Sequence, residues 1–285
     1  TVVAIAGDMD PLQLAQLVVK NFSGWKGTGP NPADPDFGKP DPKAPATAAV
    51  VEPGAPPLVA TAVLRPWQFN ADTVIFNQRR LADMLAARLI ARRLETRARA
   101  GGSYISASVS LDDVSRSANV TSVNILPLGN DWAAALRDVR AVIADAQASP
   151  PTQAEVDREY ADYETAMRTQ VETARVEAGA RQADDMADAL DIRETTTAPE
   201  TSYAILRDAR AKGMFTPATM LASARRLFTG DATRAVVNTR TPERNTTARL
   251  AQALNADVSG LAGTRTAQAA VTFDQLPASG APGVV

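Results

Sequence analysis

The sequence of 285 residues contains neither histidine nor cysteine. Histidine is the commonest general base near neutral pH, and these two residue types supply the nitrogen and thiolate ligands of most protein zinc sites. Their absence excludes a Ser-His-Asp triad, a Cys-His pair, an HExxH or HxxEH zinc motif and a thiol redox centre within this chain. What remains is carboxylate-only chemistry, Ser-Lys chemistry or no chemistry, and among these we expect no catalytic residue and no metal ligand here.

Lysine is also scarce, since Lys212 is the only one after residue 43. A Ser-Lys nucleophile would have to be built around this single residue, and we disfavour it. The formal net charge is −2 and no basic stripe alternates with aromatic residues, which argues against nucleic-acid binding. The longest apolar run is far shorter than the roughly 20 residues of a membrane helix, so we expect no membrane span.

The first part of the chain alternates strong structural signals with a proline-rich segment. An apolar run at residues 2–6 predicts a short buried strand. Asp10 and Pro11 then serve as an N-cap and a first-turn proline, and apolar residues at helical spacing predict a helix that continues to about Phe22. Residues 28–57 are rich in proline, which predicts a linker or an extended crossing.

Strand and helix patterns are found again from residue 46 onward, at the end of this proline-rich segment and after it. Residues 46–51 and 58–64 predict a β-hairpin joined by a proline-glycine turn. Residues 72–99 have apolar residues on one side and arginines on the other, which predicts a long amphipathic helix ended by Gly101 and Gly102. Alternation at residues 103–110 and 117–126 predicts an antiparallel pair of strands.

The second half is mostly helical. Residues 131–148 predict one amphipathic helix, and Thr152 and Glu155 form a capping box that opens a long helix running toward Leu190 with a kink near Gly179. Two more helices and a strand are expected at residues 202–211, after Thr216-Pro217, and at residues 232–239. This order predicts an α+β fold, with helices packed on one face of a mostly antiparallel sheet.

Three short segments carry a family resemblance. Residues 2–11 (VVAIAGDMDP) combine a strand-like run with a Gly-Asp turn, Arg97 precedes a glycine turn and a Tyr-Ser strand at residues 101–106 (GGSYIS), and residues 151–156 (PTQAEV) lead into a helix. In this order they resemble the C-terminal-type, non-metal-binding domain of the M16 zinc peptidases, the pitrilysin and processing-peptidase family. The resemblance implies an M16/LuxS-like metallohydrolase-type domain.

The resemblance also implies a domain division. Residues 1–245 would form the C-terminal-type domain, with residues 28–57 as an extended crossing inside it. Residues 246–285, which become rich in small residues after Asn255, would be a connector toward a following domain. The chain would then be an internal segment of a longer protein.

In this family the zinc motif HxxEH lies in an N-terminal-type domain, so the resemblance implies that zinc and catalysis belong to that domain, in cis or in trans. This chain would form part of a chamber that binds extended peptides, with Arg97 and Tyr104 as candidate substrate-binding residues. The alternative is that Arg97 belongs to a solvated helix face and Tyr104 is an ordinary strand aromatic, and Arg99 is a competing candidate. The family's long bacterial members imply a periplasmic location, with the cytoplasm as the alternative.

Two other functions remain open for the parent protein. One is a structural or assembly role, as in M16-like subunits that have lost catalysis. The other is a separate non-catalytic subunit that pairs with an HxxEH-bearing partner.

Several acidic and aromatic residues also have structural explanations. Asp8 and Asp10 could form a metal-binding DxD motif, but turn and cap roles explain both. The acidic residues Glu155, Asp157 and Glu159 are better explained by helix capping and the helix dipole than by catalysis. The residues Trp67 and Trp132 are better explained as core or interface anchors than as ligand-stacking groups.

Overall fold

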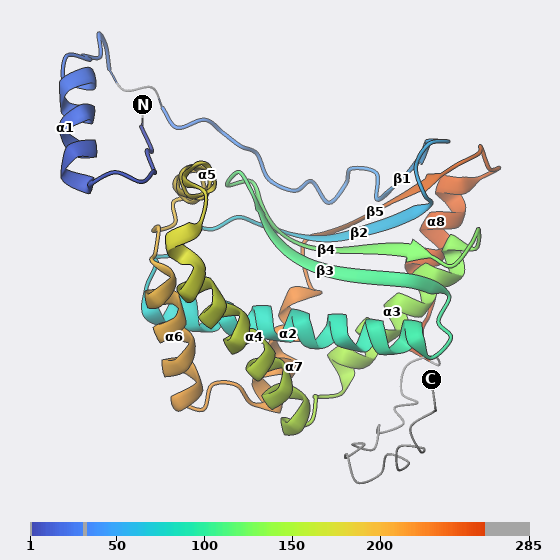
Figure 1. The fold of residues 1–285 in the computed structure, drawn as a ribbon. Coiled ribbons are helices and arrows are strands. Elements are labelled where there is room, and N and C mark those ends of the chain that lie inside the picture. The colour runs from blue at the N-terminus through green and yellow to red at the C-terminus, as the bar shows by residue number, and fades with distance from the viewer. Residues whose placement is uncertain (1, 31–32, 260–285) are drawn as a thin grey trace, which may run out of the picture.

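The computed structural model describes residues 2–30 and 33–259 (Figure 1). In this part of the chain, one sheet has the strand order β1-β5-β2-β4-β3. Its strands are β1 (Thr47–Val51), β2 (Leu58–Pro66), β3 (Tyr104–Val114), β4 (Ala118–Pro127) and β5 (Ala232–Thr239). Every pairing is antiparallel except that of β1 with β5, so the sheet is mostly antiparallel, as predicted.

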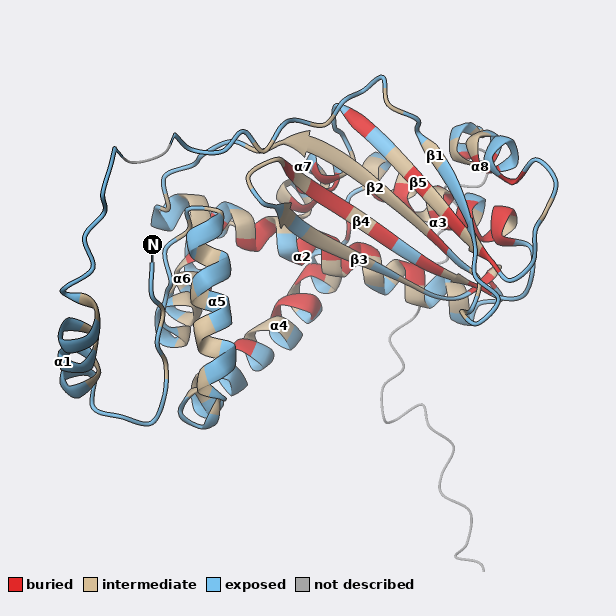
Figure 2. Cartoon of the chain, turned by 90° about the horizontal axis from the view of Figure 1, so that it is seen from above, coloured by how far each residue is buried: buried red, intermediate tan, exposed pale blue. Residues whose placement is uncertain are grey.

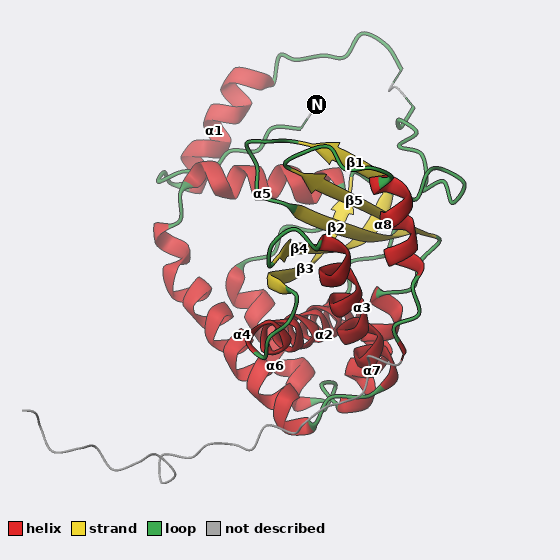
Figure 3. Cartoon of the chain, turned by 90° about the vertical axis from the view of Figure 1, so that its right-hand side faces the viewer, coloured by secondary structure: helices red, strands yellow, loops and turns green. Residues whose placement is uncertain are grey.

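The helices gather on one face of the sheet, which confirms the predicted layer arrangement (Figures 1 and 3). They are α1 (Pro11–Phe22), α2 (Val74–Arg99), α3 (Trp132–Ala148), α4 (Gln153–Thr173), α5 (Gly179–Asp191), α6 (Pro199–Ala211), α7 (Pro217–Leu227) and α8 (Thr246–Asn255), with a short 3-10 turn at Ala174–Val176. α1 and α5 are the exceptions, because α1 lies apart from the layers and α5 lies beyond one end of the sheet.

α2 lies at the centre of the fold because it contributes to two apolar cores. Ile90 and Leu94 pack with sheet residues such as Ile125 and Val237 and with α3 and α8. Leu85, on another side of α2, packs with α4, α6 and α7. The buried residues, red in Figure 2, lie along these two packing contacts of α2. A helix that is apolar on two sides must be covered on both, which explains why α2 is sandwiched between the sheet and the outer helices.

The predicted helix starts are confirmed by their caps. Asp10 accepts hydrogen bonds from the first turn of α1, and Thr216 caps α7 just before Pro217. Thr152 and Glu155 form the predicted capping box, in which each side chain bonds the other residue's backbone N–H. Gly101, with φ of +90°, follows the end of α2 in a conformation that favours glycine.

Three sequence-based expectations about individual elements were wrong. Residues 2–6 form no strand, because no strand in the described part of the chain lies beside them to complete their hydrogen bonds. β1 and β2 do not form a hairpin, since β5 lies between them and pairs with both. The helix expected to run toward Leu190 with a kink near Gly179 is instead two helices, because α4 ends at Thr173 and α5 begins at Gly179, after a 3-10 turn and the extended Glu177.

The packed core continues past residue 245, where the sequence placed the end of the domain. Leu250 and Ala253 of α8 are buried in the same core as β5 and α3. Arg140 of α3 donates to the carbonyl oxygens of Ala253 and Ala256, at 2.9 and 2.8 Å, which ties the end of α8 to the domain. The division at residue 245 stays a prediction, and most of the expected connector lies outside the described residues.

Candidate functional site

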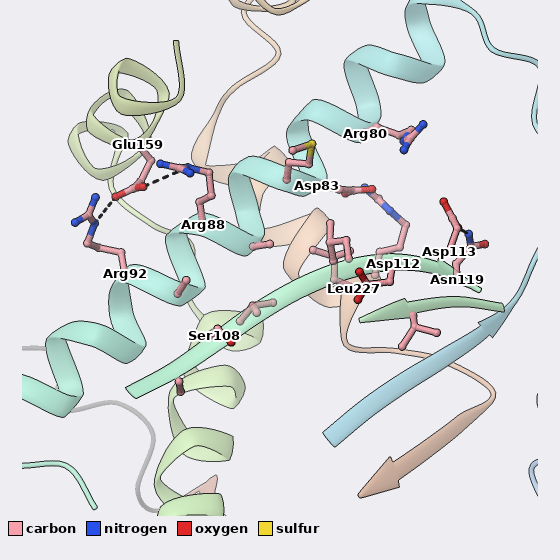
Figure 4. Close-up of a pocket in the computed structure, with 18 of the residues that line it drawn as sticks. Arg80, Asp83, Arg88, Arg92, Ser108, Asp112, Asp113, Asn119, Glu159 and Leu227 are labelled. Carbon is pink, nitrogen blue, oxygen red and sulfur yellow. Dashed lines mark hydrogen bonds and ion pairs between the residues drawn. The ribbon is translucent and has the colours of Figure 1, made fainter. Parts of the chain in front are cut away.

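A groove of about 1450 Å³ runs between α2 and the outer edge of β3 (Figure 4). Among the α2 residues that line it, Ala87 and Ala91 are small and lie one helical turn apart, between longer side chains such as Arg88 and Arg92. Larger residues at these positions would fill the space between helix and strand. The opposite wall is formed by β3 from Tyr104 to Asp113, and α4 contributes Glu159 and Tyr163.

In the described part of the chain, β3 is the last strand of the sheet and pairs only with β4. Its other edge therefore presents backbone N–H and C=O groups that no strand of the described chain uses. The β3–β4 connection fixes this edge, because Ser115 and Arg116 adopt φ values of +41° and +59°, the left-handed geometry typical of tight hairpins. Ser117 closes the turn by donating to the Val114 carbonyl.

A buried carboxylate joins α4 to α2 at the groove wall. Only 2% of the Glu159 side chain is exposed, and it accepts a hydrogen bond from Arg92 Nε at 2.6 Å. Arg88 Nε lies 3.8 Å from the other carboxylate oxygen, and its guanidinium lies over the Tyr163 ring. The hydrogen bond that Arg92 donates to Glu159 raises the pKa of Arg92. This arrangement holds two cationic groups beside the groove.

We predicted helix capping and the helix dipole as the roles of Glu159, and this prediction was wrong. The residue is buried because α4 packs on α2, and its charge is compensated by arginines one turn apart on the neighbouring helix. The signal that could have found this site is the i, i+4 spacing of Arg88 and Arg92, which the sequence interpretation assigned to a solvated face.

At the end of the groove near the β3–β4 hairpin, which we call the hairpin end, polar contacts join segments that are distant in the sequence. Arg80 of α2 pairs with Glu194, and burial raises the pKa of the Glu194 carboxyl despite this partner. Arg65 donates to the Leu227 carbonyl at 2.7 Å and to Thr121 Oγ1 at 2.9 Å. Burial lowers the pKa of Arg65, and its hydrogen bonds fasten the end of α7 to the sheet.

The structure places Arg97 at the other end of α2, where it is tied to α3. Its Nε donates to Asp138 Oδ1 at 2.7 Å, and this bond raises the pKa of Arg97. The second oxygen of Asp138 accepts the backbone N–H of Ser103 at 3.0 Å. Arg97 does not line the groove, although 46% of its side chain remains exposed. The competing candidate Arg99 lines the groove and pairs with Glu95.

Tyr104 lines the groove but is only 1% exposed. Its hydroxyl donates to the Leu94 carbonyl at 2.7 Å, near the end of α2. Burial raises the pKa of the phenol well above its ordinary value, so this group stays protonated and serves as a donor within the fold. The sequence-predicted pair thus lies near one end of the groove, with each polar group already bonded to the protein.

The remaining candidates from the sequence have structural roles. Asp10 caps α1, and Asp157 bonds to Gln153 and to Arg210 at 2.8 Å. The side chain of Trp132 is buried in the core, where it donates to Glu243. Trp67, by contrast, lines the hairpin end of the groove beside Phe69.

The residues present do not fit a zinc centre. The chain has no histidine or cysteine, and the described residues contain no group of three or more acidic side chains arranged to hold a metal ion. None of the helices in the described ranges is long and apolar enough to cross a membrane.

Comparison with protein families places the chain among the peptidases. The protein-family model described as Peptidase M16 inactive domain matches residues 1–161, which is more than half of the sequence. The chain belongs to the peptidase M16 inactive-domain family. This M16 membership agrees with the resemblance carried by the Gly-Asp turn and the GGSYIS segment, and both lie within the matched residues. None of the curated proteins matches this sequence.

Solved structures share the fold of this M16 domain. A predicted insulinase family protease from Yersinia pestis superposes with a TM-score of 0.69 at 17% identity, over 86% of this chain and 53% of that one. The first half of the periplasmic protease PqqL from Escherichia coli gives 0.67 at 12% identity, over 88% of this chain and 55% of that one. A protease from Helicobacter pylori gives 0.59 at 14%, over 82% and 53%. The chain therefore spans about half the length of these structures.

Proposed function

We propose that this chain is a non-catalytic domain of a zinc-dependent M16 endopeptidase, in which it forms part of the substrate chamber and helps to bind extended peptides. The observation that carries the proposal is the groove between α2, which lines it with Ala87 and Ala91 among longer side chains, and the edge of β3 that no strand of the described residues pairs with. Family membership supports a role in a protease. The lack of histidine and cysteine supports the assignment of zinc binding and catalysis to another domain, because this chain cannot supply the zinc ligands.

An extended peptide suits this groove for a physical reason. A peptide that adds to the edge of β3 gains backbone hydrogen bonds whatever its sequence, as in other cases of strand addition. Ser106 and Ser108 of β3 line the groove with small side chains. The peptide's side chains on one face would then rest against Ala87, Ala91 and neighbouring residues of α2.

Charged groups beside the groove give it polar contacts as well. Arg88 lines the groove with 40% of its side chain exposed, and only its buried Nε faces Glu159, so the rest of the guanidinium retains donor capacity. A peptide carbonyl or carboxylate beside α2 would take this donor. Glu159 would keep Arg88 and Arg92 in position for such a contact.

Arg97 and Tyr104 remain candidate substrate-binding residues with different roles in this proposal. Arg97 would act through its exposed guanidinium, which Asp138 orients. Tyr104 would act through its ring, by shaping the groove wall, because its hydroxyl is already bonded to Leu94. In a full chamber these residues would position substrate for chemistry performed elsewhere.

The zinc-bearing partner would be an HxxEH-containing M16 domain, in cis or in trans. The alternatives are a structural M16-like scaffold and a separate non-catalytic subunit. Sequencing the open reading frame on both sides of this chain distinguishes these alternatives. An HxxEH motif in cis supports the peptidase, and flanking sequences without the motif support the scaffold or the separate subunit. We place the protein in the periplasm, supported by its likeness to the periplasmic protease PqqL, with the cytoplasm as the alternative.

Peptide binding by the purified chain tests the groove directly. A fluorescent, extended peptide of about ten residues should bind, with a fluorescence anisotropy that saturates, and an Ala91→Trp variant should weaken the binding at least tenfold by filling the groove. Arg79→Trp is the matched control, since Arg79 lies on an exposed part of α2 outside the groove and should leave binding unchanged. Equal affinity in both variants would place peptide binding somewhere other than this groove.

A further inference from the structure

The part of the chain that contains α5 has no buried residue. Every residue between Met167 and Leu206 is described by the structure, and none of them is buried. α5 lies within this stretch and contributes to neither apolar core. Figures 1 and 2 show it beyond the hairpin end of the sheet. Residues 177–198, which we call the α5 segment, are therefore not anchored by buried side chains.

Non-helical backbone flanks α5 on both sides. The 3-10 turn Ala174–Val176 is followed by Glu177, which has an extended backbone. On the far side, Arg193 adopts a φ of +61°, and residues 194–198 are irregular until Pro199 begins α6. Hinges are typically a few residues at the ends of regular elements, where φ and ψ can change without breaking a helix. The two flanks of α5 meet this description.

Two successive residues dock the α5 segment on the start of α2. Glu194 pairs with Arg80, and the backbone N–H of Thr195 donates to Asp72 at 3.0 Å. The side chains of Arg80 and Glu194 are 42% and 28% exposed, so water competes for their ion pair. The helices α4 and α6, in contrast, are held by apolar residues in a shared core. The contacts of the α5 segment can therefore break while its neighbours stay packed.

The docked position of Glu194 also has an electrostatic cost. Burial raises the pKa of the Glu194 carboxyl, Asp113 and Asp72 raise it as well, and Arg80 acts against them. The docked position thus disfavours the ionised form of Glu194, which offsets part of the stabilisation from the ion pair. Opposing contributions of this kind favour a contact that forms and breaks readily.

The docked segment closes the hairpin end of the groove. Ile192, Arg193 and Glu194 line the groove there, together with Asp113, the second-to-last residue of β3. An extended peptide and a strand both advance about 3.3 Å per residue, so a peptide paired along the whole edge of β3 would reach Asp113. The α5 segment therefore lies where one end of such a peptide would bind.

We propose that the α5 segment is a lid on the hairpin end of the groove. It opens as one unit about its two non-helical flanks, and it closes when Glu194 and Thr195 dock on Arg80 and Asp72. The open lid admits an extended peptide along the whole of β3, and the closed lid leaves only the part nearer Tyr104. The choice of ligand rests on the proposed peptide binding, whereas the movement of the lid does not.

Hydrogen exchange on the 285-residue chain without peptide tests the movement. The amides of α5 should exchange with similar protection and at least about tenfold faster than those of α4 before Met167. Arg80→Ala should speed the exchange of α5 at least about fivefold, because it leaves Glu194 without its cation. Arg79→Ala is the matched control, since Arg79 is exposed on the same helix outside the groove and should leave this exchange unchanged. Protection of α5 equal to that of α4, or no response to Arg80→Ala, would overturn the proposal.

A cross-link tests whether the lid controls access, since the chain has no cysteine of its own. In the double variant Arg80→Cys and Glu194→Cys, a short bifunctional maleimide locks the lid closed, whereas N-ethylmaleimide caps both cysteines and leaves it free. The locked form should bind a fluorescent, extended peptide of about ten residues at least about tenfold more weakly than the capped form, because locking removes the open state. Equal affinities of the two forms would overturn the proposal. A wild-type chain that binds no such peptide would contradict the proposed function, and the exchange of α5 would still decide whether the lid opens.

Discussion

Asp138 links Arg97 to the strand that forms the groove. One carboxylate oxygen accepts Arg97 Nε at 2.7 Å, and the other accepts the backbone N–H of Ser103 at 3.0 Å, just before β3 begins. A single side chain of α3 thus fixes both the end of α2 and the start of β3. The candidate Arg97 is therefore oriented by a residue that also positions the groove wall.

Asp138→Ala should destabilise the domain by about 1–3 kcal/mol, because it leaves the Ser103 N–H without its acceptor and releases Arg97. Urea unfolding followed by circular dichroism measures the change. Arg99→Ala is the control, since Arg99 forms an exposed pair with Glu95 and should change the stability by less than about 0.5 kcal/mol. Equal effects of the two variants would show that Asp138 has no special role.

Tyr104→Phe should lower the free energy of unfolding by about 1 kcal/mol at pH 7, since it removes the hydrogen bond to Leu94. The loss should shrink at alkaline pH. Burial raises the pKa of folded Tyr104 above its ordinary value of 10, so above that pH the unfolded chain loses this proton first and the wild-type protein loses stability as pH rises. Urea unfolding at pH 7 and pH 10.5 compares the two proteins, and a constant difference would contradict this explanation.

Glu159→Ala should destabilise the domain by about 1–2 kcal/mol, because it removes the buried partner of Arg88 and Arg92. Both arginines are more than a third exposed and can be rehydrated, which keeps the loss below that of a fully buried pair. Thermal unfolding measures the effect. Asp162→Ala removes only the exposed partner of Arg92 and should change the melting temperature little.

Gly102→Ala should destabilise the turn between α2 and β3. A Cβ at this position would lie 2.9 Å from the Arg97 carbonyl oxygen and 3.2 Å from Asp138 Oδ2, so the contacts that fix the groove end would have to shift. We expect a loss of about 1–3 kcal/mol, as for other strained backbone positions. Gly24→Ala is the control, because nothing lies near the added methyl group, and denaturant unfolding of the two variants distinguishes their effects.

The purified chain should not hydrolyse peptides when zinc is added, since it lacks the histidines that an M16 zinc site requires. The measurement is cleavage of a quenched fluorescent peptide with and without zinc, and with a chelator as control. Zinc-dependent cleavage by a preparation of the chain that is free of other proteases would contradict the proposal that catalysis belongs to another domain.

Local signals in the sequence were sufficient for most of the helices. The caps at Asp10, Thr152 and Thr216 involve residues within one turn, so their hydrogen bonds follow from the order of the residues alone. The 3.6-residue periodicity likewise predicted α2 and α3, because an apolar stripe must face a core wherever that core lies.

Long-range contacts were beyond the sequence patterns. Whether β1 pairs with β2 or β5 depends on which strand fills the place between them, and that strand lies some 180 residues later. Glu159 illustrates the same limit for the candidate site. Its pattern on α4 fits a capping role, and only the packing of α4 against α2 buries it between Arg88 and Arg92.

The sequence by itself determined that this chain lacks the residues of a zinc centre, that it forms helices layered on a mostly antiparallel sheet, and that it resembles the M16 family. These conclusions rest on residue chemistry and on short-range periodicity. Only the tertiary structure decided that Arg97 and Tyr104 are bonded within the fold and that, among the described residues, no strand pairs with the edge of β3 beside the groove and no core includes α1. Each of these depends on which distant elements come together, and burial and pairing are properties of that assembly.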